Sequence, residues 1–315
     1  MTQKRVSSAA SSNAYVQGST IVGDGACTEF NHGVPTEERL EAFRRAVWEA
    51  GLAYARDNLP WRGIDDAYAV YVSEVMLQQT QVSRVEKFWP RFMEAFPTID
   101  DLAHAETAQV LELWQGLGYN RRALALMRAA CACVERFDST MPDTLDDLLS
   151  LPGIGPATAG GILAFAFQKP AVYVETNVRA VFIHEFFAHH TEAVHDRELI
   201  PLVEQTCSHD NPRGWYYALL DWGAHIKQTE KNPTRRSAHY ARQSTFEGSH
   251  RQKRAFILRT VLAHSGISFT EVGALLNTEE NRMGRPSVDQ TTLNRLVDEL
   301  AAEGFFQRVD DALQV

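Results

Sequence analysis

The turn within residues 148–160 constrains the fold of this chain more than any other segment. It reads Leu-Pro-Gly-Ile-Gly-Pro from Leu151 to Pro156. Gly153 and Gly155 permit backbone conformations closed to other residues, and Pro156 stands where a first-turn proline is favoured. We predict two helices joined by a tight turn, with the second helix presenting its free backbone amides as an anion site. An ordinary αα-hairpin without a ligand is the alternative.

The middle of the chain reads as a succession of short amphipathic helices. Apolar residues recur about every 3.6 positions over residues 68–81, 83–96, 101–105, 107–115 and 120–137, and a short helix follows over 145–150. The breaks between these helices contain residues that disfavour helix, namely Pro97, Gly116, Gly118 and Pro142. No convincing strand run or βαβ alternation precedes residue 300. The predicted fold class is therefore all-α.

The two ends of the chain differ from this body. Residues 1–36 are rich in small and polar residues without a hydrophobic period, which predicts a disordered leader, and Thr36 can cap the helix that follows. Residues 251–264, 269–276 and 288–302 read as helices before an alternating run at 305–309, which together suggest a winged helix. Ser268 can cap the second of these helices, Ser287 and Gln290 can form a capping box for the third, and Gly304 can end it. The third helix either binds DNA or acts as a packing or dimer element. Its acidic residues argue against DNA contact, and they are Asp289, Asp298, Glu299 and Glu303.

Charge and cysteine content narrow the class of protein. The net charge of −9 argues against nucleic-acid binding. Residues 227–259, however, contain nine Lys or Arg and only two acidic residues. This basic run suits contact with DNA along one face, and a solvated charge run is the alternative. Cys27, Cys131, Cys133 and Cys207 form no Cys-x-x-Cys pair and read as incidental thiols. Without a membrane-length apolar run or a signal-peptide pattern, we expect a cytoplasmic, nucleoid-associated protein without a metal.

Several blocks between residues 59 and 226 carry a resemblance to a known family. They are Leu59-Pro60-Trp61, residues 73–82, Trp114–Tyr119, the hairpin, Glu175–Arg179 and Asp221–Ala224. In order and spacing they resemble the helix-hairpin-helix DNA glycosylases, which include endonuclease III and MutY, and the likeness is greatest to the MutY branch. The resemblance implies a monomer that flips a base out of mismatched or damaged double-stranded DNA.

The resemblance also implies a domain organisation. Residues 37–245 would form the glycosylase domain, with a six-helix barrel over about 67–170 and a second lobe from 37–58 and 171–245. Residues 246–315 would form the winged-helix-like domain that the helices and the alternating run suggest, in the place of the MutY domain that reads 8-oxoguanine, which is not recognisable here.

Two carboxylates are the candidate catalytic groups. Glycosidic cleavage passes through an oxocarbenium-like state, so one acid should protonate the base while another stabilises the sugar. Glu74 matches the family glutamate that protonates adenine, a position without an acid in endonuclease III. Glu175 matches the family aspartate but is one methylene longer, and Asn177 matches an asparagine near the sugar. The alternatives are a surface glutamate for Glu74 and a helix-capping acid for Glu175.

Other family positions predict how DNA is held and what is missing. Ala157 replaces the endonuclease III lysine, so no Schiff base forms there and a monofunctional enzyme is predicted. Residues 227–240 contain none of the four cysteines that a [4Fe–4S] cluster needs, so no cofactor is predicted. Asn120 replaces the second tyrosine of a family motif. The predicted DNA contacts are Gln78, Gln79, Tyr119, Gly153, Gly155, Ala157, Thr158, Arg235 and Arg236, with the two arginines holding phosphates in place of the cluster loop.

Three functions remain open on these residues. The first is a monofunctional adenine glycosylase acting opposite G or 8-oxoguanine. The second is a glycosylase for T or U opposite G, or for a damaged pyrimidine. The third is a damage-binding protein that kept the DNA clamp and lost turnover.

Overall fold

The computed structural model describes residues 30–31, 34–242 and 245–315. The predicted leader, residues 1–36, lies outside the described residues except for 30–31 and 34–36, and Cys27 lies outside them too. Internal contacts divide the chain into two compact units, Met1–Ala46 and Val47–Val315, with the boundary inside α1 (Glu37–Tyr54). The three predicted domains remain a prediction.

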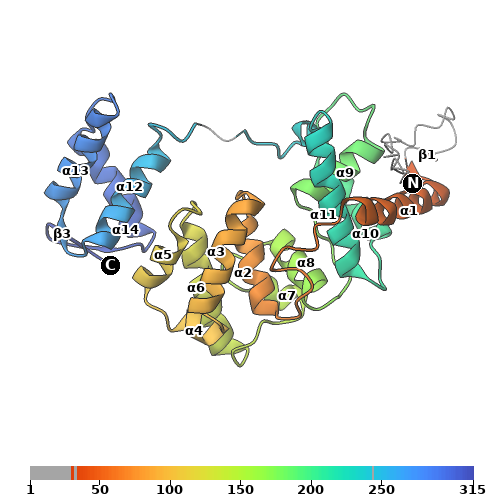
Figure 1. The fold of residues 1–315 in the computed structure, drawn as a ribbon, viewed down its shortest axis with the longest axis horizontal. Coiled ribbons are helices and arrows are strands. Elements are labelled where there is room, and N and C mark those ends of the chain that lie inside the picture. Colours follow the sequence, from red (N-terminus) through yellow and green to blue (C-terminus); the bar gives the residue numbers. More distant parts are fainter. Residues whose placement is uncertain (1–29, 32–33, 243–244) are drawn as a thin grey trace, which may run out of the picture. The chain divides into compact units, whose positions relative to one another are not determined.

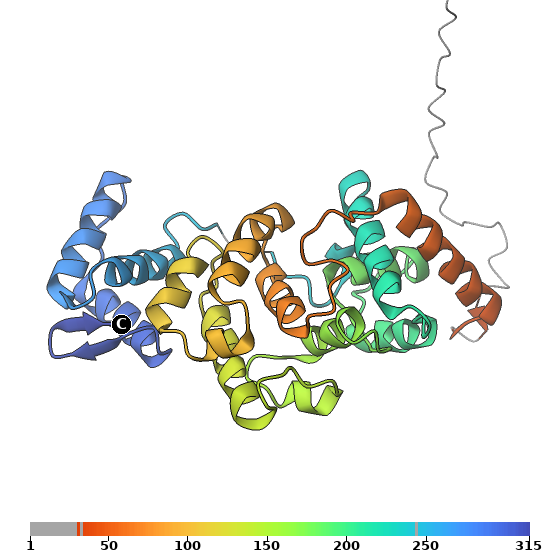
Figure 2. The ribbon, with the colours of Figure 1, turned by 60° about the horizontal axis from the view of Figure 1, so that its bottom comes forward.

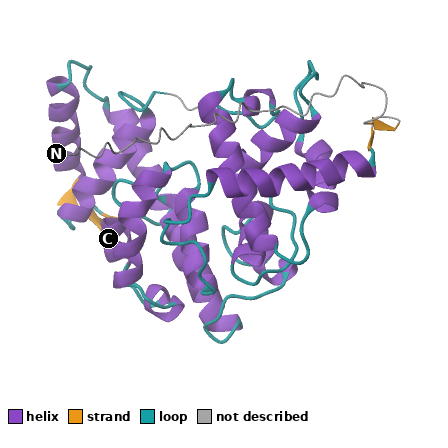
Figure 3. Cartoon of the chain, turned by 45° about the vertical axis from the view of Figure 1, so that its right-hand side comes forward, coloured by secondary structure: helices purple, strands orange, loops and turns teal. Residues whose placement is uncertain are grey.

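Helix dominates the described residues, which confirms the predicted all-α class (Figure 3). The prediction of no strand before residue 300 is wrong for three pieces of two residues each, too short to show alternation in the sequence. β1 (Phe30–Asn31) pairs with β2 (Val34–Pro35), and β3 (Ile267–Ser268) pairs with a strand near the C-terminus. Within the described residues, none of the helices has the length and apolarity needed to cross a membrane.

The first helical group of the second unit surrounds α2 (Ala67–Leu77), which contacts α3, α6 and α8 (Figure 1). Asp66 starts α2 by accepting hydrogen bonds from the amides of Tyr68 and Ala69 at 2.9 and 3.1 Å. α2 is apolar on most of its surface because it is packed on several sides. Around it lie α3 (Val82–Ala95), α4 (Ile99–Ala103), α5 (Thr107–Trp114), α6 (Arg121–Arg136), α7 (Leu145–Leu149) and α8 (Pro156–Phe165).

The second group follows the hairpin in the chain and consists of α9 (Thr176–Phe186), α10 (Asp196–Thr206), α11 (Pro212–Thr229) and η1 (Pro233–Arg236). α9 and α11 pack closely at Gly223, where a Cβ would lie 2.2 Å from the carbonyl oxygen of Asn177. The glycine of the Asp221–Ala224 block is therefore required for this helix contact. This contact brings α11 against the first turn of α9.

The C-terminal region contains α12 (His250–Ala263), α13 (Phe269–Arg282), α14 (Gln290–Ala302), β4 (Gln307–Val309) and β5 (Ala312–Gln314) (Figure 2). The strands form a sheet in the order β3-β5-β4, so three helices and a small sheet give the predicted winged-helix arrangement. The predicted capping box of Ser287 and Gln290 is wrong. Asp289 caps α14 by accepting from the amide of Thr292 at 2.8 Å, because Asn277 accepts from the Val288 amide and holds that residue outside the helix.

Candidate active site

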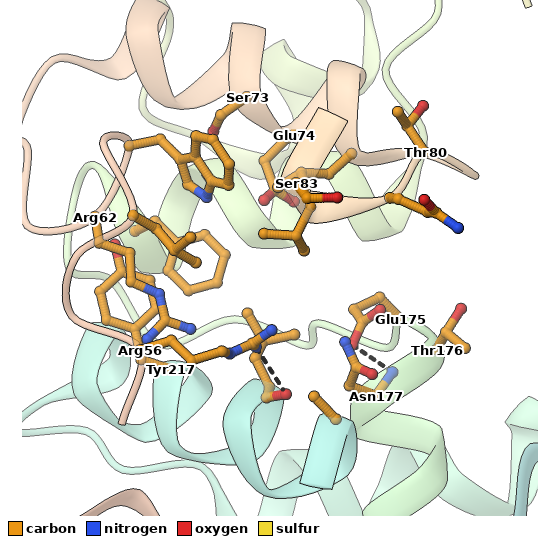
Figure 4. Close-up of a pocket in the computed structure, with 18 of the residues that line it drawn as sticks. Arg56, Arg62, Ser73, Glu74, Thr80, Ser83, Glu175, Thr176, Asn177 and Tyr217 are labelled. Carbon is orange, nitrogen blue, oxygen red and sulfur yellow. Dashed lines mark hydrogen bonds between the residues drawn. The ribbon is translucent and has the colours of Figure 1, made fainter. Parts of the chain in front are cut away.

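A pocket with a volume of about 650 Å³ opens in the second unit, beside α2, α9 and α11. Glu74 of α2 and Glu175, just before α9, enter it from opposite walls (Figure 4). Asn177 lies beside Glu175, so the three predicted catalytic residues line one pocket. Aromatic side chains cover much of the remaining wall, namely Trp61, Phe165, Tyr173 and Tyr217.

Glu74 is partly buried and is not a surface glutamate. The pKa of its carboxyl is raised to about 8, mainly by burial; the interaction with the Tyr173 side chain lowers it, and the negative charge of Glu175 raises it. A carboxyl with this pKa is largely protonated at neutral pH and can act as a general acid. Gly161 of α8 makes room for it, since a Cβ there would lie 2.4 Å from Glu74 Oε2.

Glu175 caps α9, as the alternative for this residue predicted. Its Oε1 accepts from the amides of Asn177 and Val178 at 2.5 and 3.0 Å. Among the described residues the structure records no hydrogen bond to Oε2, so the second oxygen is available to the pocket. Burial raises the pKa of Glu175, while these amides and the Lys227 ammonium lower it. The longer side chain thus folds back onto the helix end, and capping does not preclude a second role.

Asn177 leaves an unsatisfied acceptor in the site. Its Oδ1 is buried without a hydrogen-bond partner in the described part of the chain. A buried amide oxygen left without a partner costs free energy, so a water or a substrate group is expected to bond to it.

Two arginines of this pocket were not predicted from the sequence. Arg56 and Arg62 both bind the buried carboxylate of Asp221, with Arg56 Nε at 2.5 Å and both Arg62 Nη atoms at 2.7 Å. The Arg62 guanidinium also stacks 4.5 Å from the Tyr217 ring centroid. Two cations on one anion leave positive charge at the pocket wall. Arg62 directly follows the Leu59-Pro60-Trp61 block, which was the available signal.

Lys227 is a further pocket residue that sequence reasoning counted only within the basic run. It belongs to the last turn of α11. Burial lowers the pKa of its ammonium, and the neighbouring Glu175 opposes that shift. Its charge therefore stabilises the ionised form of Glu175.

Arg122 organises the loops that carry Gln78, Gln79 and Tyr119. The predicted helix 68–81 ends at Leu77, because Arg122 Nη1 binds the carbonyls of Val75 and Gln78 at 2.7 and 2.6 Å, and Gln79 turns to a φ of +52°. Arg122 Nη2 donates to the Gly118 carbonyl at 2.9 Å, next to Tyr119 at a φ of +50°. The two loops are therefore held together beside the pocket.

The hairpin has the geometry that its sequence predicts. Pro156 is the first residue of α8, Gly155 is its N-cap, and Gly153 adopts a φ of +77°. Ala157 is exposed and does not line the pocket. Thr158 is buried, and its hydroxyl accepts from Gln78 Nε2 at 3.2 Å. Any DNA contact by Thr158 must therefore come from its backbone amide.

The prediction that Arg236 binds a phosphate is wrong. Its guanidinium donates to carbonyl oxygens at the end of α9, those of Ile183, Phe187 and Ala188, so its donors are directed into the protein. Arg235 is exposed, and its predicted phosphate contact stays a prediction. The two neighbouring arginines thus differ in what they contact.

The basic run at 227–259 does not form one free cationic face. Lys253 pairs with Glu280 at 3.0 Å, and Arg254 pairs with Glu299 and Glu303 at 2.9 and 2.6 Å. These cations neutralise acids of α13, of α14 and at the end of α14 in the C-terminal region, including two of the acids that the sequence assigned to the third helix. The prediction of a single DNA-facing basic stretch is therefore wrong for these residues.

The residues present do not fit an iron–sulfur cluster. Cys131 and Cys133 are free thiols on α6 and Cys207 is a free thiol just after α10, and none of them lies in the segment where the family ligands would lie. The described residues hold no group of three or more His, Cys, Asp or Glu side chains arranged to bind a metal ion. η1 instead joins the rest of the chain through protein contacts, with the Val194 amide donating to the Arg236 carbonyl at 2.8 Å.

Comparisons with known proteins support this description. Residues 72–201 match the family model of the HhH-GPD superfamily base excision DNA repair proteins. An adenine DNA glycosylase of Mycolicibacterium smegmatis is 46% identical over 130 residues, 41% of this chain and 44% of that protein. The human adenine DNA glycosylase is 36% identical over 180 residues, 54% of this chain and 33% of that protein.

The chain spans about half the length or less of the adenine DNA glycosylases that it matches. A solved structure of a thermostable thymine-DNA glycosylase has a similar fold, with a TM-score of 0.55 at 21% identity, covering 64% of this chain and 94% of that one. The sequence match includes Glu74, Glu175 and Asn177, so it covers the carboxylate pair of the pocket. Residues 72–201 of this chain are therefore similar to the HhH-GPD superfamily, and the chain is similar to adenine DNA glycosylases over the stretches that match.

Proposed function

We propose that this protein is a monofunctional DNA glycosylase that hydrolyses the N-glycosidic bond of a flipped adenine opposite G or 8-oxoguanine. The observation that carries the proposal is the pair Glu74 and Glu175 on opposite walls of one pocket (Figure 4). Their environments differ, because only Glu175 accepts backbone amides at a helix end. Two carboxyl groups in different environments suit one acid and one stabiliser of positive charge.

Protonated Glu74 donates its proton to a ring nitrogen of the bound base. The electron pair of the glycosidic bond leaves with the base, and the sugar becomes an oxocarbenium ion. The carboxylate of Glu175 stabilises this cation through Oε2, while Oε1 stays on the amides of α9. Asn177 Oδ1 accepts a hydrogen bond from the attacking water, which passes its proton to the Glu175 carboxylate as the new C–O bond forms.

The base has a pocket suited to a flat aromatic ring. Trp61, Phe165 and Tyr217 contribute aromatic surface, and the Arg62 guanidinium contributes hydrogen-bond donors. Arg62 is held by Asp221, so its orientation is set before the base enters. Stacking surface with a few fixed donors is how enzymes read a flipped base.

We further propose that the partner is mismatched double-stranded DNA, held by a monomer without a cofactor. The amides at the start of α8 suit a phosphate, and Gln79 and Tyr119 lie on loops held together by Arg122. Ala157 offers no amine, so the product is an intact strand with an abasic site.

A panel of duplexes bearing single mismatches or lesions, treated with alkali after incubation, tests this function. Cleavage only after alkali, at A opposite 8-oxoguanine or G, supports the proposal. Cleavage at G·T, G·U or an oxidised pyrimidine reassigns the substrate to pyrimidines. Tight binding without abasic product from any duplex indicates a binding protein and refutes the enzyme.

A further inference from the structure

The loop between α5 and α6 carries Tyr119, and the C-terminal region contacts the side chain of this residue. Arg251 Nη1, in the first turn of α12, donates a hydrogen bond to the Tyr119 hydroxyl oxygen at 3.0 Å, across 132 residues of sequence. The Arg251 guanidinium also lies 5.8 Å from the centroid of the Tyr119 ring. Both residues belong to the second compact unit. The C-terminal region is therefore bonded to one of the predicted DNA contacts.

A second link joins the same two segments. Glu303, at the end of α14, binds Arg121 Nη2 at 2.5 Å and Arg254 Nη2 at 2.6 Å. Arg254 follows Arg251 by three residues in α12, so the two side chains project from one face of this helix. Arg121 begins α6, two residues after Tyr119. α12 also contacts α5, the helix before the loop. The C-terminal region is therefore held against this loop by more than one contact.

The backbone of the loop and the Tyr119 side chain have different supports. Arg122 Nη2 fixes the backbone by donating to the carbonyls of Leu117 and Gly118 at 3.3 and 2.9 Å. The Tyr119 side chain is 37% exposed, and an exposed aromatic side chain can change rotamer unless another group holds it. The bond from Arg251 is made to the hydroxyl, at the end of the side chain farthest from the backbone. It therefore restricts the rotation of the ring.

We infer that Arg251 is a positioning residue that holds the Tyr119 side chain oriented for insertion into the duplex, so that the C-terminal region takes part in base flipping. The inference rests on the proposed function, in which Tyr119 contacts the DNA. A side chain that is already oriented loses less conformational entropy on insertion than one that rotates freely. Arg251 therefore acts on the DNA through Tyr119, and not through a phosphate contact of its own.

The experiment measures base flipping by the full chain on a duplex with adenine opposite 8-oxoguanine, using the fluorescence of 2-aminopurine placed next to the adenine. Arg251→Met removes the donor and keeps a side chain of similar width and shape near the ring. It should lower the flipping equilibrium constant by about threefold to tenfold, the loss expected for one such hydrogen bond. Flipping should not change in Arg259→Met, the matched control. Arg259 is an exposed residue of the same helix that lies over the Phe256 ring, and the described part of the chain shows no contact between it and Tyr119.

A double-mutant cycle with Tyr119→Ala separates positioning from a direct phosphate contact. If Arg251 acts through Tyr119, then Arg251→Met should have no further effect in the Tyr119→Ala protein. The slope of the logarithm of the DNA-binding constant against the logarithm of salt concentration should also stay the same. An equal loss of flipping in both backgrounds, with this slope less steep by about one, would show that Arg251 binds a phosphate itself and would overturn the inference.

Tyr119→Phe tests the same hydrogen bond from its other end if Arg251→Met fails to fold. It removes the acceptor and keeps the ring, so flipping should again fall. Unchanged flipping in both variants, with normal excision of adenine, overturns the inference and leaves the proposed function standing. The flipping assay requires binding and no excision. An unaltered protein that flips the base but yields no abasic product from any duplex therefore overturns the proposed function alone.

Discussion

Arg122 Nη1 donates a hydrogen bond to the carbonyl oxygen of Gln78 at 2.6 Å, across 44 residues of sequence. The same guanidinium donates to Thr80 Oγ1 and to the carbonyls of Leu117 and Gly118 at 3.1, 3.3 and 2.9 Å. It lies over the rings of Trp114 and Tyr119. Burial lowers its pKa to about 10, so it stays charged at neutral pH. One buried cation therefore fixes two loops that are predicted to enter DNA.

Replacing Arg122 with Met should uncouple these loops. We expect a loss of about 2–4 kcal/mol in unfolding free energy from the lost charged hydrogen bonds, and weaker base flipping, measured with 2-aminopurine fluorescence next to the mismatch. Arg84→Met is the control, since exposed Arg84 donates only one recorded bond to the same region, to the Gly116 carbonyl at 3.1 Å. Equal flipping in the two variants would show that Arg122 has no special role.

The pKa of Glu74 predicts how stability depends on pH. Its folded pKa of about 8 lies above the ordinary value of 4.5, so its contribution is fully present below about 4.5 and is lost as pH rises through 8. Glu74→Gln removes this ionisation. We expect the unfolding free energy of the variant, relative to that of the unaltered protein, to rise by a few kcal/mol between pH 4.5 and pH 9. Thermal unfolding across this pH range measures the difference. Parallel curves would contradict the raised pKa.

The two oxygens of Glu175 predict two separable effects. Gln keeps an acceptor for the α9 amides but has no charge for the sugar cation, so Glu175→Gln should lose excision by a hundredfold or more with little change in Tm. Glu175→Ala also removes the cap and should cost about 1 kcal/mol more stability. Alkali-cleavage assays and thermal melts of both variants measure this difference. Full activity of the Gln variant would exclude the catalytic role.

Arg235 and Arg236 should respond differently to the same substitution. Arg236→Ala leaves the carbonyls at the end of α9 without their donors and should destabilise the protein by about 1–3 kcal/mol. Arg235→Ala should leave stability unchanged. If Arg235 contacts a phosphate, the substitution should also make the plot of the logarithm of the DNA-binding constant against the logarithm of salt concentration less steep, by about one in slope. Chemical denaturation and binding at several salt concentrations test both. A stable Arg236→Ala protein would refute the helix-end role.

Local patterns in the sequence determined the helical class and the hairpin. Periodic apolar residues, Pro156 and the two hairpin glycines act over a few residues, and the helices from α2 to α7 begin and end within four residues of their predicted ends. The helices of the C-terminal region followed from the same signals, apart from the end of α13, which runs to Arg282 and not to 276, and the start of α14. A polar residue at 287 and another at 289 both resemble caps, and only the contact of Val288 with Asn277 decides between them.

Tertiary structure decided how the functional residues act. The sequence placed Glu74, Glu175 and Asn177 in one site only through a resemblance, and it could not show that Asp221 binds Arg62, 159 residues away. Arg236 looked like a DNA contact because its neighbours are basic, yet packing turned it onto α9. Helix and turn signals depend on neighbours in sequence. Burial, charge pairing and proton affinity depend on neighbours in space, which only the folded chain brings together.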